Sequence, residues 1–341
     1  MSLSEYQKAS GSSDKKVPVN RRQNLANLLS DGGPVLMEGG VVERVRRGAP
    51  DLLDPLLMNA PLIYSEAGRA LLHQVFVEYM AIGRMHDLPL LSLAPTWRAN
   101  SDRLAASAFA KRDLNGDAVR FLQTIRDEFG EYGSKIYIGG LMGCRGDAYK
   151  PQEALPRAAA QAFHLIQARA LVEAGADYLM ASTMPEIHEA LGMAEALAST
   201  GCPYLVSFIV RPSGCLLDGT PLDEAMLRAD DEVSSRPLGY LVNCIHSSAL
   251  DAALGTPLGQ RALATGRLLG LQANTSPKSP EELDGSDELE GEAPELFAAD
   301  MCTLRNRFGL RVLGGCCGTD ARHIAALAKG LIKEQLRLDH E

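Results

Sequence analysis

The 341-residue chain is predicted to fold as a single-domain (β/α)8 TIM barrel, and three observations lead to that prediction. Eight short apolar runs, each long enough for one strand, recur along the chain. Longer stretches with the 3.6-residue apolar period of amphipathic helices separate these runs. No linker or break in composition divides the chain into two domains. A doubly wound open sheet is the alternative architecture that the same alternation allows.

The N-terminal segment, residues 1–20, is polar and contains the run Gly-Ser-Ser-Asp-Lys-Lys at positions 11–16. Such a composition predicts a flexible tail, so the barrel is assigned to residues 21–341. A helix is predicted over residues 21–29, where three leucines share one face.

The barrel elements follow in order along the chain. The longest predicted helices cover residues 66–85, 154–173 and 187–198. Gly175 separates the second of these helices from the next strand, as a helix-ending glycine does. An acidic segment at 281–292 is predicted to be a solvated surface loop, with a lid over the site as the alternative. The eight predicted strands are residues 35–37, 89–93, 135–139, 177–180, 204–208, 239–242, 268–272 and 312–313.

The bulk composition limits what the protein does and where. The net charge of −9 argues against nucleic acid and anionic membranes as partners. No apolar run approaches the roughly 20 residues that a membrane-spanning helix needs. The N-terminus lacks a signal-peptide core, and seven cysteines without regular spacing fit a reducing compartment. A cytoplasmic protein is therefore predicted.

Two adjacent cysteines, Cys316 and Cys317, lie between the last predicted strand and a helix, with glycines on both sides. The C-terminal end of a strand is where barrel enzymes keep their chemistry. The pair is open to three interpretations: small core residues, a strained vicinal disulfide, or two thiolate ligands of one metal ion. A metal ion would need at least one further ligand elsewhere in the chain.

Cys244 follows the sixth predicted strand and supplies that ligand. In a ring of eight strands, only one strand separates the sixth from the eighth, so three sulfur atoms can reach one point. Three thiolates with a fourth position open are typical of catalytic zinc. His246 would face the same way as Cys244 in an extended segment, but it is predicted to lie beside the site or at the surface. The other four cysteines are predicted to be ordinary residues: Cys144, Cys202, Cys215 and Cys302.

A second interpretation of the same turn is a phosphate site. Gly314 and Gly315 precede a helix N-terminus after the eighth strand, which is where barrels commonly bind phosphate. In that case the cysteines would be incidental and no metal would be present.

The motif Gly-Gly-Cys-Cys-Gly-Thr at 314–319, together with Asn-Cys-Ile-His at 243–246, resembles the homocysteine S-methyltransferase family. Weaker similarities lie at 38–40, 95–100, 174–177 and 207–208. The resemblance implies Zn2+ held by Cys244, Cys316 and Cys317. Zinc would deprotonate the thiol of homocysteine, whose reference pKa is near 8.5. That sulfur would take a methyl group from a small onium donor and give methionine.

The resemblance also implies the two small-molecule partners, a thiol acceptor and a methyl donor. The chain is too short for an additional cobalamin or folate domain, so the donor is expected to be S-methylmethionine, S-adenosylmethionine or a betaine. Trp97 offers this cation an aromatic face, or else packs in the barrel. The oligomeric state stays open, with a homo-oligomer among the options.

Contacts to the amino-acid end of the acceptor follow from the resemblance. Its carboxylate would bind the backbone at Gly39 and Gly40 and the side chain of Thr96, and its ammonium would bind Glu38. Asn243 is a further predicted substrate contact.

Ser182 is a departure, because the family usually has glutamate there. A charge-assisted hydrogen bond contributes roughly 1.5–3 kcal/mol, and a serine hydroxyl offers only a neutral acceptor. The change therefore leaves four options open: a longer reach by Glu38, a nearby acid such as Glu186, a different thiol acceptor, or a binding barrel without catalysis.

Overall fold

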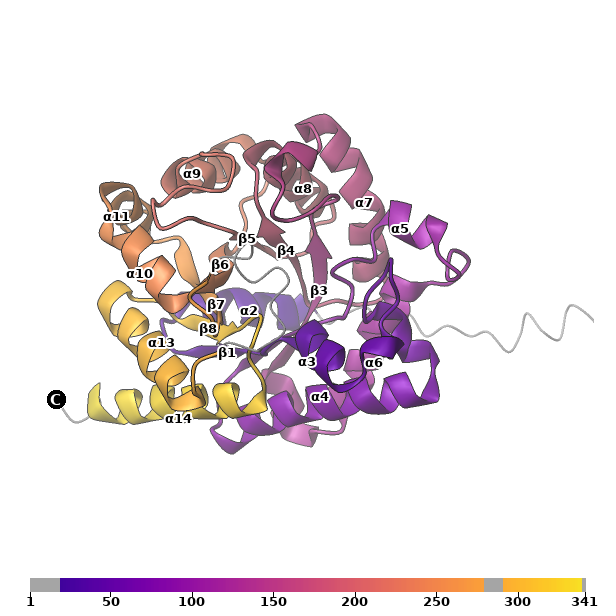
Figure 1. The fold of residues 1–341 in the computed structure, drawn as a ribbon, viewed down its shortest axis with the longest axis horizontal. Helices are drawn as coiled ribbons and strands as arrows, with labels where there is room; N and C mark the ends of the chain where they lie inside the picture. Colours follow the sequence, from indigo (N-terminus) through magenta and orange to yellow (C-terminus); the bar gives the residue numbers. More distant parts are fainter. Residues whose placement is uncertain (1–18, 279–290, 339–341) are drawn as a thin grey trace, which may run out of the picture.

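The computed structural model describes residues 19–278 and 291–338, which form a closed barrel of eight parallel strands in the order β1 to β8 (Figure 1). The predicted TIM barrel is therefore confirmed, and the open sheet is excluded. Most of the predicted tail and nearly all of the acidic segment lie outside the described residues. The strands are β1 (Val35–Met37), β2 (Leu90–Leu93), β3 (Ile136–Gly143), β4 (Tyr178–Met184), β5 (Tyr204–Phe208), β6 (Gly239–His246), β7 (Leu268–Asn274) and β8 (Val312–Gly315).

Five strands run further than their apolar runs predict, and of these β7 and β8 each extend by two residues beyond the predicted end. β3, β4 and β6 each extend by four residues beyond the predicted end. The four-residue extensions mix glycine and polar residues with apolar ones such as Leu141, Met184 and Ile245, so they do not continue an uninterrupted apolar run. These extensions reach the C-terminal end of the barrel, where a TIM barrel places its site.

The helices surround the barrel, as Figure 1 shows. α4 begins and ends as predicted, whereas α7 begins three residues late, after Pro156 at its N-cap. The helices of the described residues are α2 (Val19–Ser30), α3 (Val41–Gly48), α4 (Glu66–Met85), α5 (Ser101–Ala106), α6 (Leu114–Asp127), α7 (Arg157–Glu173), α8 (Ile187–Ser199), α9 (Leu222–Glu232), α10 (Ser247–Gly255), α11 (Pro257–Ala264), α13 (Pro294–Phe308) and α14 (Ala321–Leu338), with short 3₁₀ turns at Pro50–Leu52, Ala60–Tyr64, Gly130–Lys135 and Pro151–Glu153. None of them is long and apolar enough to cross a membrane.

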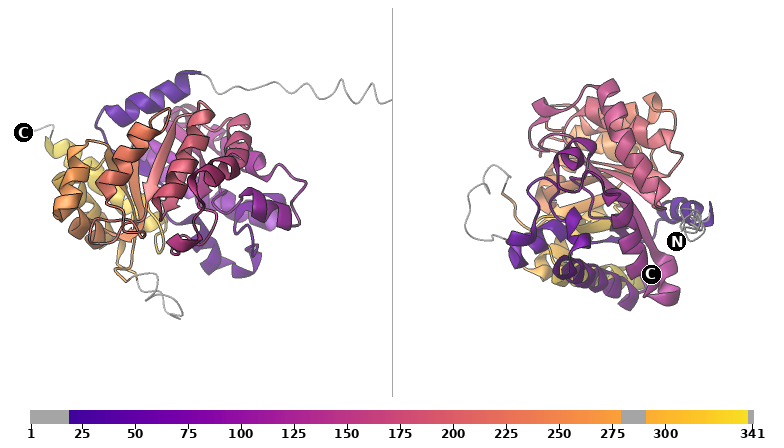
Figure 2. Two further views of the ribbon diagram at one scale, coloured as in Figure 1. Left: turned by 90° about the horizontal axis from the view of Figure 1, so that it is seen from above. Right: turned by 90° about the vertical axis from the view of Figure 1, so that its right-hand side faces the viewer.

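The core has two parts. One packs the helices against the outside of the barrel, and the other fills the barrel interior with side chains such as Met37, Tyr178 and Leu205. Leu25 and Leu29 of α2 belong to the interior cluster. Figure 2 shows α2 lying across one end of the barrel. This helix therefore closes the barrel floor, and the opposite end stays open for ligands.

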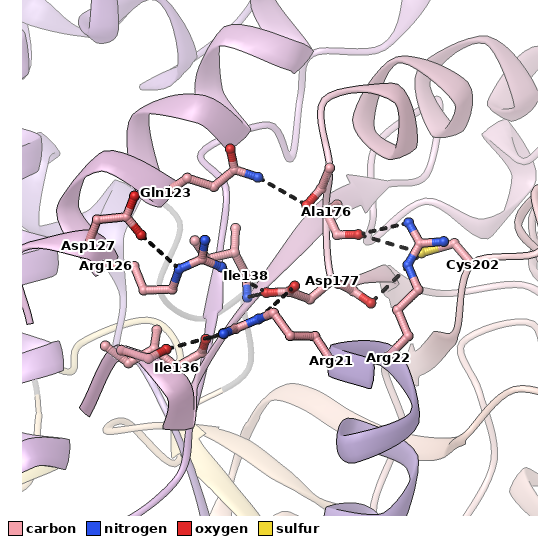
Figure 3. Close-up of polar contacts among 12 residues, drawn as sticks. Arg21, Arg22, Gln123, Arg126, Asp127, Ile136, Ile138, Ala176, Asp177 and Cys202 are labelled. Atoms are coloured by element: carbon pink, nitrogen blue, oxygen red, sulfur yellow. Dashed lines mark hydrogen bonds and ion pairs between the residues drawn. The ribbon is translucent and has the colours of Figure 1, made fainter. Parts of the chain in front are cut away.

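Asp177 holds α2 in place at the closed end of the barrel (Figure 3). Its carboxylate is fully buried and accepts hydrogen bonds from Arg21 Nε at 3.1 Å, from Arg126 Nη1 at 3.3 Å and from Ile138 N at 2.8 Å. Arg21 also donates to the carbonyl of Ile136. Two cations thus compensate the buried charge.

Replacing Asp177 with alanine is expected to lower the free energy of unfolding by about 3–5 kcal/mol, because Arg21 and Arg126 lose their partner in a buried setting. Thermal unfolding measures the effect. Asp127→Ala is the matched control, since Asp127 is exposed and contacts Arg126 at 3.5 Å. That variant is expected to change stability by less than about 1 kcal/mol. Equal shifts for both variants would contradict the anchoring role.

Candidate active site

An open cavity of about 270 Å³ lies at the C-terminal end of the barrel. All of the predicted site residues except Thr96 line it. They come from the ends of β1, β4, β6 and β8 and from the turn after β8. The strand topology therefore brings together residues that lie far apart in the sequence.

The three predicted metal ligands meet in this cavity. The Sγ atoms of Cys244, Cys316 and Cys317 lie within 4.8 Å of one another. The Sγ atoms of Cys244 and Cys316 are 2.7 Å apart, longer than the roughly 2.05 Å of a disulfide bond. Thiolates about 2.3 Å from one tetrahedral zinc ion lie about 3.8 Å apart. The donor atoms and their grouping within 4.8 Å therefore suit zinc, and the sulfur atoms of Cys244 and Cys316 would separate by about 1 Å to bind it.

An irregular backbone sets the direction of Cys244. Its φ is +58°, and the pairing of β6 with β7 shifts register between Asn243 and Ile245. Such a bulge re-aims a side chain and breaks the strict alternation of a strand. His246 accordingly lies outside the cysteine group: its Nδ1 caps α10 by accepting from Ser248 N, and its Nε2 is 3.4 Å from Glu292 Oε1.

The glycines around the double cysteine allow close approach of the backbone. A Cβ on Gly40 would lie 2.5 Å from the carbonyl oxygen of Cys316. A Cβ on Gly315 would lie 2.3 Å from Thr319 Oγ1. The turns after β1 and β8 are packed too tightly for side chains at these positions, so the cysteines face the cavity.

The three thiols shift one another's pKa values. Hydrogen bonds from Cys316 and then Cys317 hold the pKa of Cys244 well below its ordinary value, despite burial. The hydrogen bonds with Cys244 and then with Cys317 raise the pKa of Cys316, and the bond to Cys244 raises that of Cys317 to about 12. Cys244 is therefore the thiol of the three that ionises most readily, and a bound cation would take the place of the protons on the other two.

Three of the four cysteines predicted to be ordinary are buried outside the cavity. Burial raises the pKa of Cys144 to about 12, of Cys202 to about 11 and of Cys302 to about 12. These three side chains are buried thiols away from the cavity, and Cys302 lies in α13 as a helical residue.

Glu38 is a buried acid in the cavity wall. Its Oε2 accepts from Ser92 Oγ at 2.7 Å and from Leu93 N at 3.1 Å. Burial raises the pKa of Glu38 to about 8, although both hydrogen bonds oppose this shift. A cationic ligand group beside Glu38 would stabilise its carboxylate.

Two of the expected carboxylate donors already have acceptors. Gly40 N donates to Thr319 Oγ1 at 2.9 Å. Thr96 is fully buried, and its hydroxyl donates to the carbonyl of Leu141 at 2.7 Å. A carboxylate would have to displace these partners to use either group.

Asn243 holds the β4 and β6 ends of the site together. Its Oδ1 accepts from Thr183 N at 3.1 Å and from Ser207 Oγ at 2.6 Å. Its Nδ2 donates to Thr183 Oγ1 at 2.9 Å and to Cys244 Sγ at 3.2 Å. Thr183, like Cys244, has a positive φ, which is rare for a β-branched residue. One buried carboxamide therefore supports two strained residues, and its own hydrogen bonds are used within the protein.

Asn243→Ala is expected to lower zinc affinity by about 10- to 100-fold, the usual effect of removing a group that orients a metal ligand. Competition with a chelator measures it. Asn115→Ala is the control, because Asn115 is also buried and hydrogen-bonded but lies outside the cavity. Both variants should lose stability, and a similar zinc affinity in both would contradict this role.

Ser182 lies inside β4 and lines the cavity, with its Oγ 3.2 Å from Thr183 Oγ1. Glu186, the acid considered as its substitute, caps α8 by accepting from Glu189 N at 2.8 Å. It does not line the cavity. Of the two acids considered for the ammonium group, Glu38 is therefore the one that is buried and lines the cavity.

Several cavity residues carry no signal in the sequence: Tyr149, Arg46, Asn59 and Gln272. Tyr149 comes from the segment between β3 and α7, which has neither periodicity nor a motif. Burial, and then the negative charge of Cys244, Cys317 and Cys316, raises the pKa of Tyr149. Tyr149 thus lines the same cavity as the three cysteines.

Trp97 also lines the cavity, but the guanidinium of Arg98 lies 5.1 Å from its ring centroid. One aromatic face is occupied by the protein's own cation. A donor cation could use only the other face.

The turn after β8 does not suit phosphate. Four of its backbone N–H groups already have acceptors within the protein: Gly315 N donates to Glu38 O, Cys316 N to Ala273 O, Cys317 N to Asn274 Oδ1 and Thr319 N to Cys316 O. A phosphate would have to displace these acceptors to use the four donors.

Comparison with known proteins bears directly on this site. The family model described as homocysteine S-methyltransferase matches residues 35–331. The chain belongs to the homocysteine S-methyltransferase family. The match spans the barrel from β1 into α14 and includes all three cysteines of the cavity. Like its relatives, the chain is a methyltransferase.

The relatives resemble the chain over most of its length. It is 27% identical to "Homocysteine S-methyltransferase" of Escherichia coli (strain K12), covering 91% of this chain and 99% of that protein. It is 22% identical to "Betaine--homocysteine S-methyltransferase 1" of Bos taurus, covering 93% of this chain and 76% of that protein. The metallated crystal structure of the homocysteine methyltransferase MmuM from Escherichia coli superposes with a TM-score of 0.69 at 25% identity, covering 89% of this chain and 99% of that chain.

Proposed function

We propose that the protein is a zinc-dependent methyltransferase that moves a methyl group from a small onium donor to the thiol of homocysteine. The observation that carries the proposal is the convergence of three cysteine sulfur atoms in one cavity with the buried acid Glu38. The names of the relatives in this family support homocysteine as the acceptor. The word "metallated" in the MmuM title supports a metal.

Cys244, Cys316 and Cys317 would hold the zinc ion as thiolates. Zinc bound there lowers the pKa of an acceptor thiol, so that the thiol is ionised at neutral pH. Asn243 keeps Cys244 in its bulged conformation, and the glycines at 315 and 318 keep the double cysteine turned toward the cavity. The acceptor sulfur forms a bond to the methyl carbon as the bond from that carbon to the onium sulfur or nitrogen breaks, and the donor leaves with one less positive charge.

Glu38 would receive the ammonium group of the acceptor. The carboxylate is held by Ser92 and Leu93, so its position is fixed before the ligand arrives. Arg46 lines the same cavity and would attract the acceptor carboxylate. Glu43 accepts from Arg46 Nη1 at 2.7 Å, so the arginine is held near the mouth.

A different thiol acceptor is the second candidate, and Ser182 is the observation that favours it. Its hydroxyl lines the cavity where a charged partner of the ammonium is expected by family resemblance. A thiol acceptor without an ammonium group would need no charged partner at this position.

Ser182→Glu is expected to tighten homocysteine binding by about 10-fold or more, because a charge-assisted contact replaces a neutral one. Calorimetric titration of the zinc-loaded protein measures the change. Ser199→Glu, on the outer helix α8, is the control and should leave affinity unchanged. Unchanged or weaker binding by the Ser182 variant would show that this position does not face the ammonium group.

Turnover tests the proposal itself. Zinc-loaded protein is incubated with homocysteine and, in turn, S-methylmethionine, S-adenosylmethionine and betaine, and methionine is quantified by mass spectrometry. Methionine is expected with at least one donor. Methylation of a second thiol in preference to homocysteine would support the alternative acceptor. No methylated thiol with any donor, despite full zinc loading, would contradict the proposal.

A further inference from the structure

One buried carboxylate holds both ends of the segment 145–155, which connects β3 to α7. Glu189 Oε1 accepts from Arg145 N at 2.7 Å, and Glu189 Oε2 accepts from Leu155 N at 3.0 Å. Glu189 lies in the first turn of α8 and is fully buried. The two oxygens of one side chain therefore tie the segment into a loop.

The buried charge has a partner. His164 Nε2, on α7, is 3.0 Å from Glu189 Oε1, and neither side chain is exposed. Burial alone would raise the pKa of Glu189, but the hydrogen bonds from His164, Arg145 and Leu155 lower it below its ordinary value. The group is thus an ionised carboxylate, and its hydrogen bonds are of the stronger, charge-assisted kind.

The segment carries Tyr149 to the cysteine group. Internal bonds stiffen it: Tyr149 N donates to Asp147 Oδ1 at 3.0 Å, and Asp147 N donates to Glu153 Oε2 at 3.0 Å. From outside, Arg98 Nη1 donates to the carbonyl of Gly146 at 2.7 Å. Tyr149 lines the same cavity as Cys244, and burial and then the charge of Cys244 raise the pKa of its phenol. A loop fixed at both ends and stiffened within places one aromatic side chain against one metal ligand.

We propose that Glu189 is a positioning residue of the active site, which holds Tyr149 over Cys244 through the ends of the segment 145–155. Tyr149 covers the Cys244 sulfur from solvent and orients it for the metal. The orientation of Cys244 for a metal rests on the proposed function. The shielding of Cys244 from solvent does not depend on it.

The test compares three variants of the full chain with the wild type: Glu189→Gln, Tyr149→Ala and the double variant. In Glu189→Gln the amide keeps the side-chain volume but loses the charge and one acceptor oxygen. Glu195→Gln is the matched control, because Glu195 is another carboxylate of α8 and pairs with Arg157 outside the cavity. Two readouts apply to the metal-free protein: amide hydrogen exchange at Arg145 and Leu155, and the rate of Cys244 alkylation followed by peptide mass spectrometry. Zinc affinity is measured separately by competition with a chelator.

Glu189→Gln is expected to accelerate exchange at both amides, to speed Cys244 alkylation and to lower zinc affinity by about 10-fold. Tyr149→Ala is expected to reproduce the last two effects while the amides stay protected. In the double variant, alkylation should be no faster than in Tyr149→Ala alone, because residues acting through one contact are not additive. Glu189→Asp, which restores the charge, should recover part of the wild-type protection and serves as the second variant if the glutamine variant does not fold.

Two results would overturn the inference. One is faster exchange at both amides with unchanged Cys244 alkylation, because the tie would then have no influence on the site. The other is additive acceleration in the double variant. A wild-type protein that binds no zinc would instead refute the proposed function, and the alkylation rates would still decide the role of Glu189.

Discussion

Replacing Cys316 with serine is expected to remove bound zinc and to abolish methyl transfer. A serine hydroxyl stays protonated where a thiol ionises, so the variant loses one of three anionic ligands. Removing groups that merely orient a metal ligand lowers affinity by about 10- to 100-fold, so losing a ligand should cost at least about 100-fold. Metal analysis of the purified variant measures zinc directly, and methionine formation measures turnover.

Cys215→Ser is the matched control for this loss. Cys215 is a free cysteine with partial exposure like that of Cys316, but it lies outside the cavity. The control should keep wild-type zinc content and turnover. A Cys316 variant that retains stoichiometric zinc would show that the metal is held elsewhere, and equal losses in both variants would point to general damage.

Glu38→Gln is expected to weaken acceptor binding by about 10- to 100-fold, because the ammonium group loses a charged partner worth roughly 1.5–3 kcal/mol. The amide oxygen can still accept from Ser92 and Leu93, so the cavity wall should keep its shape. Titration calorimetry with homocysteine measures the loss. A thiol without an ammonium group is the control ligand and should bind both proteins alike. Equal affinity of the wild type and the variant for homocysteine would show that Glu38 does not bind the ammonium group.

The same variant has a predicted effect on stability. The pKa of Glu38 is raised from 4.5 to about 8, so between these pH values the folded protein keeps a proton that the unfolded chain has lost. Wild-type stability should therefore fall as pH rises from 4.5 to 8, by up to about 1.4 kcal/mol per pH unit, and level off above pH 8. Glu38→Gln lacks this loss. Melting temperatures of the ligand-free proteins at pH 5 and pH 8 measure the difference, and parallel changes in both proteins would contradict the raised pKa.

Much of the barrel was predictable because apolar periodicity is a local property. The runs at β1 and β5 and the whole of α4 have the predicted bounds. The ends of β3, β4 and β6 were not predictable from the apolar runs, because glycine and polar residues interrupt the apolar pattern before the strands end. Those residues contribute to the site, so each strand continues beyond the end of its apolar pattern.

The cysteine group could be predicted because its spacing and neighbouring glycines form a motif with few structural alternatives. The positions of Tyr149 and Glu189 could not be predicted from the sequence. Tyr149 lies in an irregular segment, and its position depends on a carboxylate 40 residues further along the chain. Thr96 illustrates the opposite difficulty: the resemblance assigns it to substrate, but in the structure its hydroxyl donates to Leu141. Long-range hydrogen bonds of this kind produce no periodic pattern in the sequence.

Zinc K-edge X-ray absorption on protein purified without chelator tests the central claim most directly, because it reports the atoms around the metal. The proposed site predicts one zinc per chain with three sulfur neighbours at about 2.3 Å, and a fourth sulfur when homocysteine is added. A spectrum dominated by nitrogen or oxygen neighbours, or one unchanged by homocysteine, would contradict it.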